Sequence, residues 1–548
     1  MPSSYRVGRR KRATDADTNV SESEILRSLF ELRTRCNNQS FAYSRPEVTE
    51  ITFWNCLWTQ RIITSLRKLI VRDGHKFSSI KFFDCEVINS NFAEIVSMIL
   101  RCNATTKLVI KARKPVGNRN ESNGEQIPRC ESTTDVYFME NEVLAAIRDG
   151  ILVNKSLKYL QVSGLNFSDA TTSKSRDGII GNDDNVINSL DNSAKFWYEI
   201  LCRNKSIVDL DLSGSNLSKS TISGISSSLF LNTTLESLNL GRCFLDDQSL
   251  AEILNSVKNH ARLMKLDLSR NFLAEGTSMK ALDAVAELLR SKTSKLQCLN
   301  LSYQQQPRTK TIFPDVDNNV EGISVAEAKY RNAFKHAFYA LSTNTTLRRI
   351  DLSGNSGCFS DMACIEALTS CLVTNTGLSH IDISGCNIAP VGFRYLARNC
   401  VPRCDRNLKS LVLFDGESNK NLVTKNENWC TIFSLLEMGL QSNSALECLG
   451  DFGDIGRNSK SRRNLQYLLN MNRAGRRAFQ IDDLSLGAWP NILARACRIE
   501  YDTYEKKLDY DDSINTRKES RSTIISASVL FEFLHGPALL IDSKPTKR

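Results

Sequence analysis

Residues 235–245, Leu-Glu-Ser-Leu-Asn-Leu-Gly-Arg-Cys-Phe-Leu, decide the fold of this chain. The same phrase, Leu-x-x-Leu-x-Leu followed by a turn residue and a further leucine, begins again at Leu263, 28 residues later. Between the two copies, the apolar residues of 250–257 follow the helical period, so one unit reads strand, turn, helix. A period in the range of about 20 to 29 residues with this phrase predicts a solenoid, whose units bury a core only by stacking.

Further copies extend the pattern over most of the chain, giving about twelve units by this phrase. The clear ones begin at Leu157, Ile207, Leu235, Leu263, Leu296, Leu347, Leu378 and Leu408, and weaker ones at Val48, Phe77, Thr105 and Leu446. Longer steps coincide with polar inserts at 111–132, 170–192 and 304–325. These inserts hold too few apolar residues to join a core, so we expect them to loop out or to be disordered.

The phrase assigns a direction to each of its residues. Its leucines point inward from a short parallel strand, and the residues between them face the open side of the sheet. The ninth position is expected to turn inward and to hydrogen-bond loop backbone; it is held by Cys56, Cys85, Cys243, Asn271, Asn355 and Cys386. Ser215 and Gln304 depart from this usage, which predicts looser turns there.

The pattern resembles the ribonuclease-inhibitor type of leucine-rich repeat over residues 46–452. The resemblance implies an α/β horseshoe solenoid with parallel strands on the concave face, helices on the convex face and helical caps at its ends. A capping box at Ser21–Glu24 followed by an apolar helical face predicts an N-terminal cap helix over 21–36. The domains are then a disordered basic segment, 1–20, a solenoid with its cap helix, 21–452, and a helical C-terminal region, 461–541.

Composition favours an intracellular protein. The chain has 548 residues, no apolar run long enough to span a membrane and no apolar segment near its start. Its 17 cysteines show no CxxC spacing, and its five histidines form no Cys/His cluster, so we expect reduced thiols and no metal site. We expect a cytoplasmic or nuclear protein, because the basic residues of 6–12 can be interpreted either as an import signal or as a solvated tail.

Several Asn-x-Ser/Thr triplets occur just before a predicted strand. We interpret them as helix terminators and turn residues rather than as glycan acceptors; they include Asn103, Asn204, Asn232 and Asn344.

The C-terminal region carries a second basic concentration. Residues 455–480 hold seven arginines or lysines around a predicted helix, and Arg473, Arg476 and Arg477 cluster near its end. These arginines either complement the helix dipole in solvent or form an anion or acidic-partner site. Segments 472–477, 486–490 and 536–539 resemble the C-terminal region of uncharacterised leucine-rich-repeat proteins of diatom-type algae, which implies kinship over 461–541 and leaves the function of this region open.

No motif for catalysis is present. The chain lacks a Gly-x-Ser-x-Gly elbow, a phosphate-binding loop, a dinucleotide fingerprint and an HExxH helix. We therefore expect no enzyme activity, no catalytic residue, no cofactor and no small-molecule substrate.

The open sheet face is the candidate binding site. Its central column predicts an acidic and amide stripe, made of Asp211, Asn239, Asp267, Asn300, Asp351 and Asp382. Beside it we expect the aromatic residues Trp54, Phe83, Tyr159, Tyr303 and Phe414, with Arg242 and Arg270 at one edge. The alternative is that the stripe is ordinary framework usage of the repeat.

These features favour a non-catalytic scaffold or adaptor that binds a protein of unknown identity on the concave face. One alternative is a small-GTPase regulator, because Ran GTPase-activating proteins have similar repeats; this chain lacks their acidic segment. Another is nucleic-acid binding through the basic termini, which the scarcity of aromatic residues in 455–480 disfavours. The net charge of +10 permits an acidic partner without requiring one.

Overall fold

The computed structural model describes most of the repeat region. The described residues are 3–7, 21–37, 48–56, 58–72, 76–85, 90–111, 141–167, 192–273, 279–304, 325–355, 358–359, 361–404, 407–416, 429–453, 455, 459–476 and 495. The three predicted inserts and residues 477–494 and 496–548 therefore lie almost wholly or wholly outside them. The chain divides into two compact units, one of residues 1–299 with 304–307, the other of residues 300–303 with 308–548.

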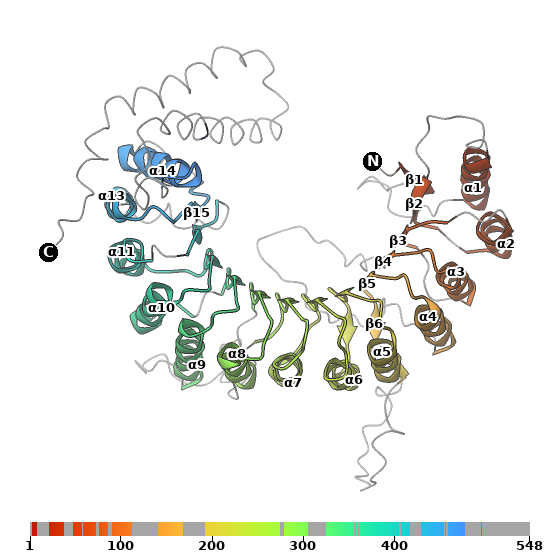
Figure 1. Cartoon of the computed structure of the whole chain (residues 1–548), viewed down its shortest axis with the longest axis horizontal. Coiled ribbons are helices and arrows are strands. Elements are labelled where there is room, and N and C mark those ends of the chain that lie inside the picture. Colours follow the sequence, from red (N-terminus) through yellow and green to blue (C-terminus); the bar gives the residue numbers. More distant parts are fainter. Residues whose placement is uncertain are drawn as a thin grey trace, which may run out of the picture. The chain divides into compact units, whose positions relative to one another are not determined.

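In the first unit, parallel strands follow the order of the chain and helices line one side of them (Figure 1). The strands are β1 (Ser3–Val7), β2 (Val48–Trp54), β3 (Ser79–Phe83), β4 (Lys107–Lys111), β5 (Tyr159–Ser163), β7 (Asp209–Asp211), β9 (Ser237–Asn239) and β10 (Lys265–Asp267), with a separate pair of β6 (Asn166–Phe167) and β8 (Asn216–Leu217). The helices are α1 (Glu22–Asn37), α2 (Gln60–Arg67) with a π-helical turn Lys68–Arg72, α3 (Ser90–Arg101), α4 (Asn141–Val153), α5 (Asn192–Arg203), α6 (Lys219–Leu229), α7 (Asp247–Val257) and α8 (Lys280–Arg290).

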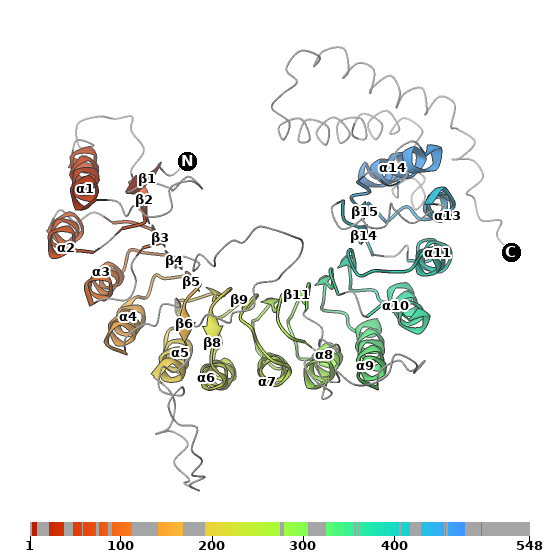
Figure 2. The ribbon, with the colours of Figure 1, turned by 180° about the vertical axis from the view of Figure 1, so that it is seen from behind.

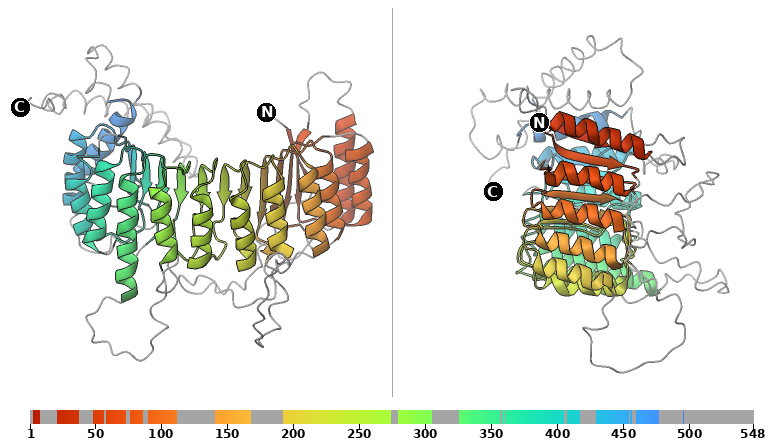
Figure 3. Two further views of the ribbon diagram at one scale, coloured as in Figure 1. Left: turned by 60° about the horizontal axis from the view of Figure 1, so that its bottom comes forward. Right: turned by 90° about the vertical axis from the view of Figure 1, so that its right-hand side faces the viewer.

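The second unit repeats this arrangement, and the reverse view shows its helices on one side of its strands as well (Figure 2). After β11 (Cys298–Asn300), at the boundary, come β12 (Arg349–Asp351), β13 (His380–Asp382), β14 (Ser410–Phe414) and β15 (Cys448–Gly450). The helices are α9 (Val325–Ser342), α10 (Met362–Thr374), α11 (Pro390–Asn399), α13 (Trp429–Ser442) and α14 (Lys460–Arg473). Within each unit, successive helices lie side by side (Figure 3).

The Leu-x-x-Leu-x-Leu phrase has the role predicted for it. Leu235, Leu238 and Leu240 are at most 1% exposed, while the residues flanking Leu238 in β9 are partly exposed on the other face of the sheet. The same alternation recurs in β7, β12 and β13. The predicted α/β solenoid of stacked strand, turn and helix units is confirmed, and its cap helix is α1, whose first turn donates from Glu24 N to Ser21 Oγ.

Residues 3–7 correct the expectation that 1–20 is disordered. They form β1, which pairs in parallel with β2. Val7 is fully buried, and the Tyr5 hydroxyl donates to the Ser28 carbonyl of α1. The five residues contain no repeat phrase, so no local pattern predicts a strand whose partner lies about 45 residues further on.

The ninth position of the phrase joins neighbouring units. Cys243 donates from Sγ to the Leu212 carbonyl, and Asn271 donates from Nδ2 to the Leu240 carbonyl. Ser215 and Gln304 were expected to mark looser turns, but they form the same kind of hydrogen bond to the preceding repeat. Ser215 Oγ donates to Val162 O at 3.2 Å, and Gln304 Nε2 donates to Leu268 O at 2.9 Å. That expectation is wrong, because a hydroxyl or a longer amide also reaches the preceding turn.

A second set of asparagines lies at the helix ends and connects each repeat to the preceding repeat. Asn204 donates from Nδ2 to the carbonyls of Ile151 and Asn154, and its Oδ1 accepts the N–H groups of Ser206 and Ile207. We call this set the asparagine ladder; Asn154, Asn204, Asn232, Asn375 and Asn443 make such bonds in both directions. The prediction that Asn204 and Asn232 terminate helices is confirmed. Each of these side chains also satisfies backbone groups of two neighbouring repeats at once.

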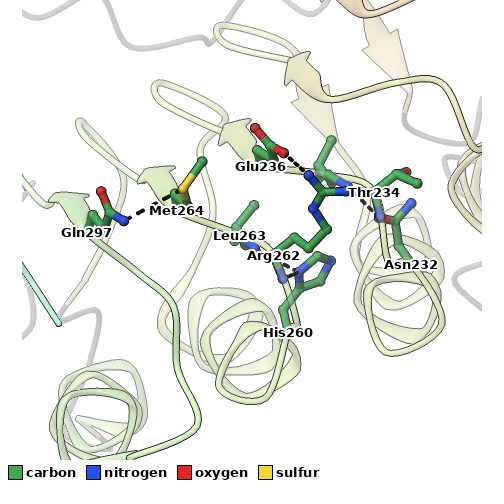
Figure 4. A network of polar contacts seen from close by, with 9 residues as sticks. Asn232, Thr234, Glu236, His260, Arg262, Leu263, Met264 and Gln297 are labelled. Carbon is green, nitrogen blue, oxygen red and sulfur yellow. Dashed lines mark hydrogen bonds and ion pairs between the residues drawn. The ribbon is translucent and has the colours of Figure 1, made fainter.

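His260 takes the ladder position after Asn232 (Figure 4). Its Nδ1 accepts the N–H groups of Arg262 and Leu263, at 3.2 and 3.0 Å. The neutral ring must therefore carry its proton on Nε2. Nε2 is buried and has no hydrogen-bond partner in the described part of the chain, whereas the asparagines donate from this side to a carbonyl.

We expect His260 to make stability depend on pH. Burial lowers the pKa of His260 below its usual value, so the unfolded chain takes up a proton first as the pH falls. Its contribution is fully present above the ordinary histidine pKa and is lost as the pH falls from there towards the lowered pKa, by at most about 1.4 kcal/mol per pH unit. Urea unfolding between pH 8 and 5 will show a smaller slope in His260→Asn than in the wild type; the variant keeps the part due to His380, whose pKa burial also lowers. His336→Asn, on the exposed side of α9, is the control and should keep the wild-type slope.

Phe414 corrects another expectation. Predicted to face the open side of the sheet, it is 1% exposed and packs among rings, with centroids 5.4 Å from Phe393 and 5.0 Å from Phe452. The register of β14 against β15 shifts between Ser410 and Phe414, so the simple alternation of faces ends before Phe414. Opposite it, Gly450 has a φ of 99° and no room for a Cβ against the Phe414 carbonyl.

The long insertions that interrupt the repeat period all occur at the same position within a repeat. Residues 112–140 lie between β4 and α4, 168–191 between β6 and α5, 305–324 before α9, and 417–428 between β14 and α13. Each follows a strand and precedes a helix. The connections from α3 through α10 to the next strands, and the connection from α13 to β15, are five to seven residues long, and the asparagine ladder lies in them.

Candidate functional site

The sheet face opposite the helices carries the predicted stripe, and we call it the open face. In the first unit the strand register places Asp211 beside Gln161 on one side and Asn239 on the other, and Asn239 beside Asp267. In the second unit Asp351 lies beside Asp382. Asn300 lies in the same unit, where the next residue, Leu301, donates its N–H to the Asp351 carbonyl. All six stripe residues are partly exposed.

One oxygen of each stripe residue is already used by the fold. Asp211 Oδ1 accepts the N–H of Ser213 at 2.9 Å, and Asp267 Oδ1 accepts that of Ser269 at the same distance. The bond from residue i+2 recurs at Asn239, Asn300, Asp351 and Asp382. Aspartate and asparagine serve this turn equally well, because it needs only an acceptor oxygen. The framework interpretation thus explains the residue type, and the charge is what it leaves unexplained.

The aspartates are crowded and partly desolvated. Burial, opposed by the Ser384 hydroxyl and reinforced by Asp351, raises the pKa of Asp382. Burial and the charges of Asp211 and Asp209 raise the pKa of Tyr159 to about 12. Carboxylates held close together in this way make a local negative field that favours a cationic group of a partner.

Three of the predicted aromatic residues lie in the first unit and are partly exposed. Trp54 and Phe83 stack with their centroids 4.5 Å apart, and Tyr159 lies under the Lys107 ammonium, 4.4 Å from the ring centroid. Tyr303, in the second unit, is 41% exposed. Phe414 does not belong to this surface.

Arg242 and Arg270 lie in the turns after β9 and β10 and have left-handed backbone, with φ values of 60° and 58°. The corresponding residues Gly214 and Gly354 have φ values of 73° and 72°. Both arginine side chains are exposed at the edge of the open face. A bulky residue in this conformation costs about 1–2 kcal/mol relative to glycine's freedom there, so the fold does not explain why arginine is used.

The predicted basic C-terminal patch is not one surface. Arg476 is 6% exposed, and its guanidinium donates to the carbonyls of Leu440 and Gln441 at 3.2 and 2.6 Å, where it closes the C-terminal end of α13. Burial lowers the pKa of Arg476. Arg473 is partly exposed and donates to Asn470, and Arg477 lies outside the described residues. Arg476 therefore binds the carbonyl end of α13 and does not complement the dipole of α14 in solvent.

The described residues form neither a metal-binding cluster nor a membrane-spanning helix. Among them, no group of three or more His, Cys, Asp or Glu side chains is placed to hold a metal ion. No helix in this part of the chain combines the length and apolar character needed to cross a membrane.

The sequence analysis missed a second column on the open face. The residues two positions before the stripe also face outward and lie side by side in register: Ser79, Lys107, Tyr159, Asp209, Ser237 and Lys265. Their signal was present, because they precede the central leucine of the phrase by one residue just as the stripe follows it.

Strands of the Leu-x-x-Leu-x-Leu phrase, backed by a row of helices and joined by turn residues, form a leucine-rich-repeat solenoid. No protein-family model matches the sequence. Over 277 residues the chain is 26% identical to the NACHT, LRR and PYD domains-containing protein 3 of Bos taurus, a match that covers 47% of this chain and 24% of that protein. The chain thus spans about a quarter of the length of this curated relative.

Solved structures of low similarity include the TLR13–ssRNA13 complex, at 14% identity over 82% of this chain and 55% of that one, with a TM-score of 0.33. The Rad7–Elc1 complex of yeast matches at 12% identity over 72% of this chain and 84% of that one, with a TM-score of 0.32. The tropomodulin C-terminal domain of Caenorhabditis elegans matches at 15% identity over 32% and 90%, with a TM-score of 0.23. The kinship of 461–541 to the diatom-type family stays a prediction.

Proposed function

We propose that this protein is a non-catalytic scaffold that binds a protein partner on the open face. The observation that carries the proposal is the stripe itself: each unit holds aspartates in register on a sheet face that no helix covers within the described residues. Their turn bonds need an acceptor oxygen and no charge. The partly exposed aromatic residues beside them add the type of side chain that is enriched at protein interfaces.

The cysteines support a location inside the cell. The 14 described cysteines are unpaired, and nine of them are buried. Burial raises the pKa of the Cys371 thiol to about 12 and that of Cys243 to about 12 as well. Unreactive reduced thiols in this number suit a reducing compartment.

The test replaces charge and keeps the turn. We expect Asp211→Asn/Asp267→Asn and Asp351→Asn/Asp382→Asn to fold with unchanged thermal stability, because Asn239 and Asn300 already make the same turn bond. Affinity capture followed by quantitative mass spectrometry will show at least one pair losing specific partners by tenfold or more, equivalent to about 1.4 kcal/mol. Asp283→Asn/Glu366→Gln, on the helix side, is the matched control. Capture that is equal for all variants would mean that the stripe is framework only.

A further inference from the structure

Cations gather on the open face over β1–β4. The strand register brings them together in two neighbouring columns and at the strand ends: Arg6, Lys81, Lys107 and Lys111. The carboxylate that faces the same way on these strands is Glu50, which pairs with Lys81 at 2.9 Å. Positive charge therefore exceeds negative charge on this half.

Aromatic rings hold two of these cations, Arg6 and Lys107, in place. The Arg6 guanidinium lies over the Trp54 ring, 5.6 Å from its centroid, and Trp54 stacks on Phe83. Lys107 lies over Tyr159. A cation fixed on a ring face loses less conformational entropy when it binds an anion than a free lysine does.

The opposite charge gathers over β7–β10. Asp209 and Asp211 lie two residues apart in β7, and Asp267 lies two strands away in β10 beside Asn239. Lys265 is the cation that faces outward from these strands, and Arg242 and Arg270 lie beyond them at the edge of the open face, so the excess of negative charge is confined to the two outward columns of β7–β10. Burial raises the pKa of Asp209 despite its bond to Ser237.

Between the two halves lies β5, whose outward side chains are neutral. Tyr159 donates its hydroxyl to Gln161 Oε1 at 3.1 Å. From β3 to β9 there are four strand spacings, which is roughly 19 Å, or about six residues of extended chain.

We propose that the open face of the first unit recognises a segment of a protein partner with divided charge, its carboxylates over β1–β4 and its amines over β7–β10. This inference rests on the proposed function and names the partner's chemistry. A nucleic acid fits less well, because a polyanion that reached past β5 would meet the aspartates of β7 and β10. A uniformly acidic or uniformly basic segment would match one half and be repelled by the other.

Synthetic peptides test the division of charge on the full chain. One labelled peptide carries four glutamates, a six-residue Gly/Ser spacer and four lysines; a second has the same composition with glutamates and lysines alternating. By fluorescence anisotropy at low salt, we expect the block peptide to bind at least tenfold more tightly than the alternating one. We expect Lys107→Gln/Lys111→Gln and Asp209→Asn/Asp211→Asn each to remove at least tenfold of that affinity. Lys195→Gln/Lys292→Gln, on the helix side, should change nothing.

Equal binding of the two peptides would overturn the proposal. So would tighter binding of a 16-nucleotide single-stranded DNA that is lost in Lys107→Gln/Lys111→Gln. The peptide test and the capture test distinguish the two proposals. If the two peptides bind equally while the Asp→Asn pairs still lose captured partners, the scaffold function stands and the divided charge does not select the partner. If the Asp→Asn pairs also capture the same partners as the wild type, both proposals are wrong.

Discussion

Phe414→Ala will lower the free energy of unfolding by about 3–5 kcal/mol. The side chain is buried among four rings, and besides Phe393 and Phe452 its centroid lies 6.3 Å from Trp429 and 6.0 Å from Phe433. Alanine would remove these contacts and leave a cavity in the second unit, because rings anchored on α11, on α13 and in the turn after β15 can close it only in part. Urea or guanidinium unfolding followed by tryptophan fluorescence measures the loss.

Phe230→Ala is the matched control for this variant. Phe230 is 63% exposed at the end of α6, so its replacement should change the free energy of unfolding by no more than about 0.5 kcal/mol. A loss at Phe414 as small as that at Phe230 would mean that Phe414 faces solvent, as the strand alternation alone predicted.

Asn204→Ala will cost about 3 kcal/mol or more, although it removes only a small polar side chain. Its amide forms hydrogen bonds with four backbone groups, two in its own turn and two in the preceding repeat. Asn204 is 4% exposed, so water cannot readily replace these bonds. Each buried group left without a partner costs about 1–3 kcal/mol.

Asn255→Ala controls for the loss of an amide as such. Asn255 lies on the exposed side of α7, and its replacement should leave the free energy of unfolding within about 0.5 kcal/mol of the wild type. Hydrogen exchange adds a second measurement: the N–H groups of Ser206 and Ile207 should lose protection in Asn204→Ala. Unchanged protection there would argue against the ladder as a link between units.

The periodic parts of this fold follow from sequence because the phrase states both an element and a direction. Leu235 and its equivalents predicted the strands, the buried side and the register that aligns Asp211 with Asn239. Asn204 was correctly interpreted as a helix terminator. Its bonds to Ile151 were beyond reach, because an insert outside the described residues separates the two and only three-dimensional packing brings them together.

The errors arose where a residue's environment is set by another segment. Val7 is buried by strand pairing across more than 40 residues, Phe414 by a register shift at the end of β14, and Arg476 by the neighbouring helix end. The stripe was located correctly from the phrase. The turn bond that each aspartate makes with the residue two positions later could be seen only in the structure. The bond shows that the turn requires an acceptor oxygen and does not require the negative charge of the aspartate.

The placement of the long inserts after strands has a practical consequence for protein engineering. A reporter domain or an affinity tag introduced into 168–191 or 305–324 would enlarge a connection that the chain already lengthens, so we expect it to leave the packed units intact. The same cargo placed between α5 and β7 would separate Asn204 from the turn it holds. These two intervals are therefore sites for attaching a fluorescent or capture handle to the protein.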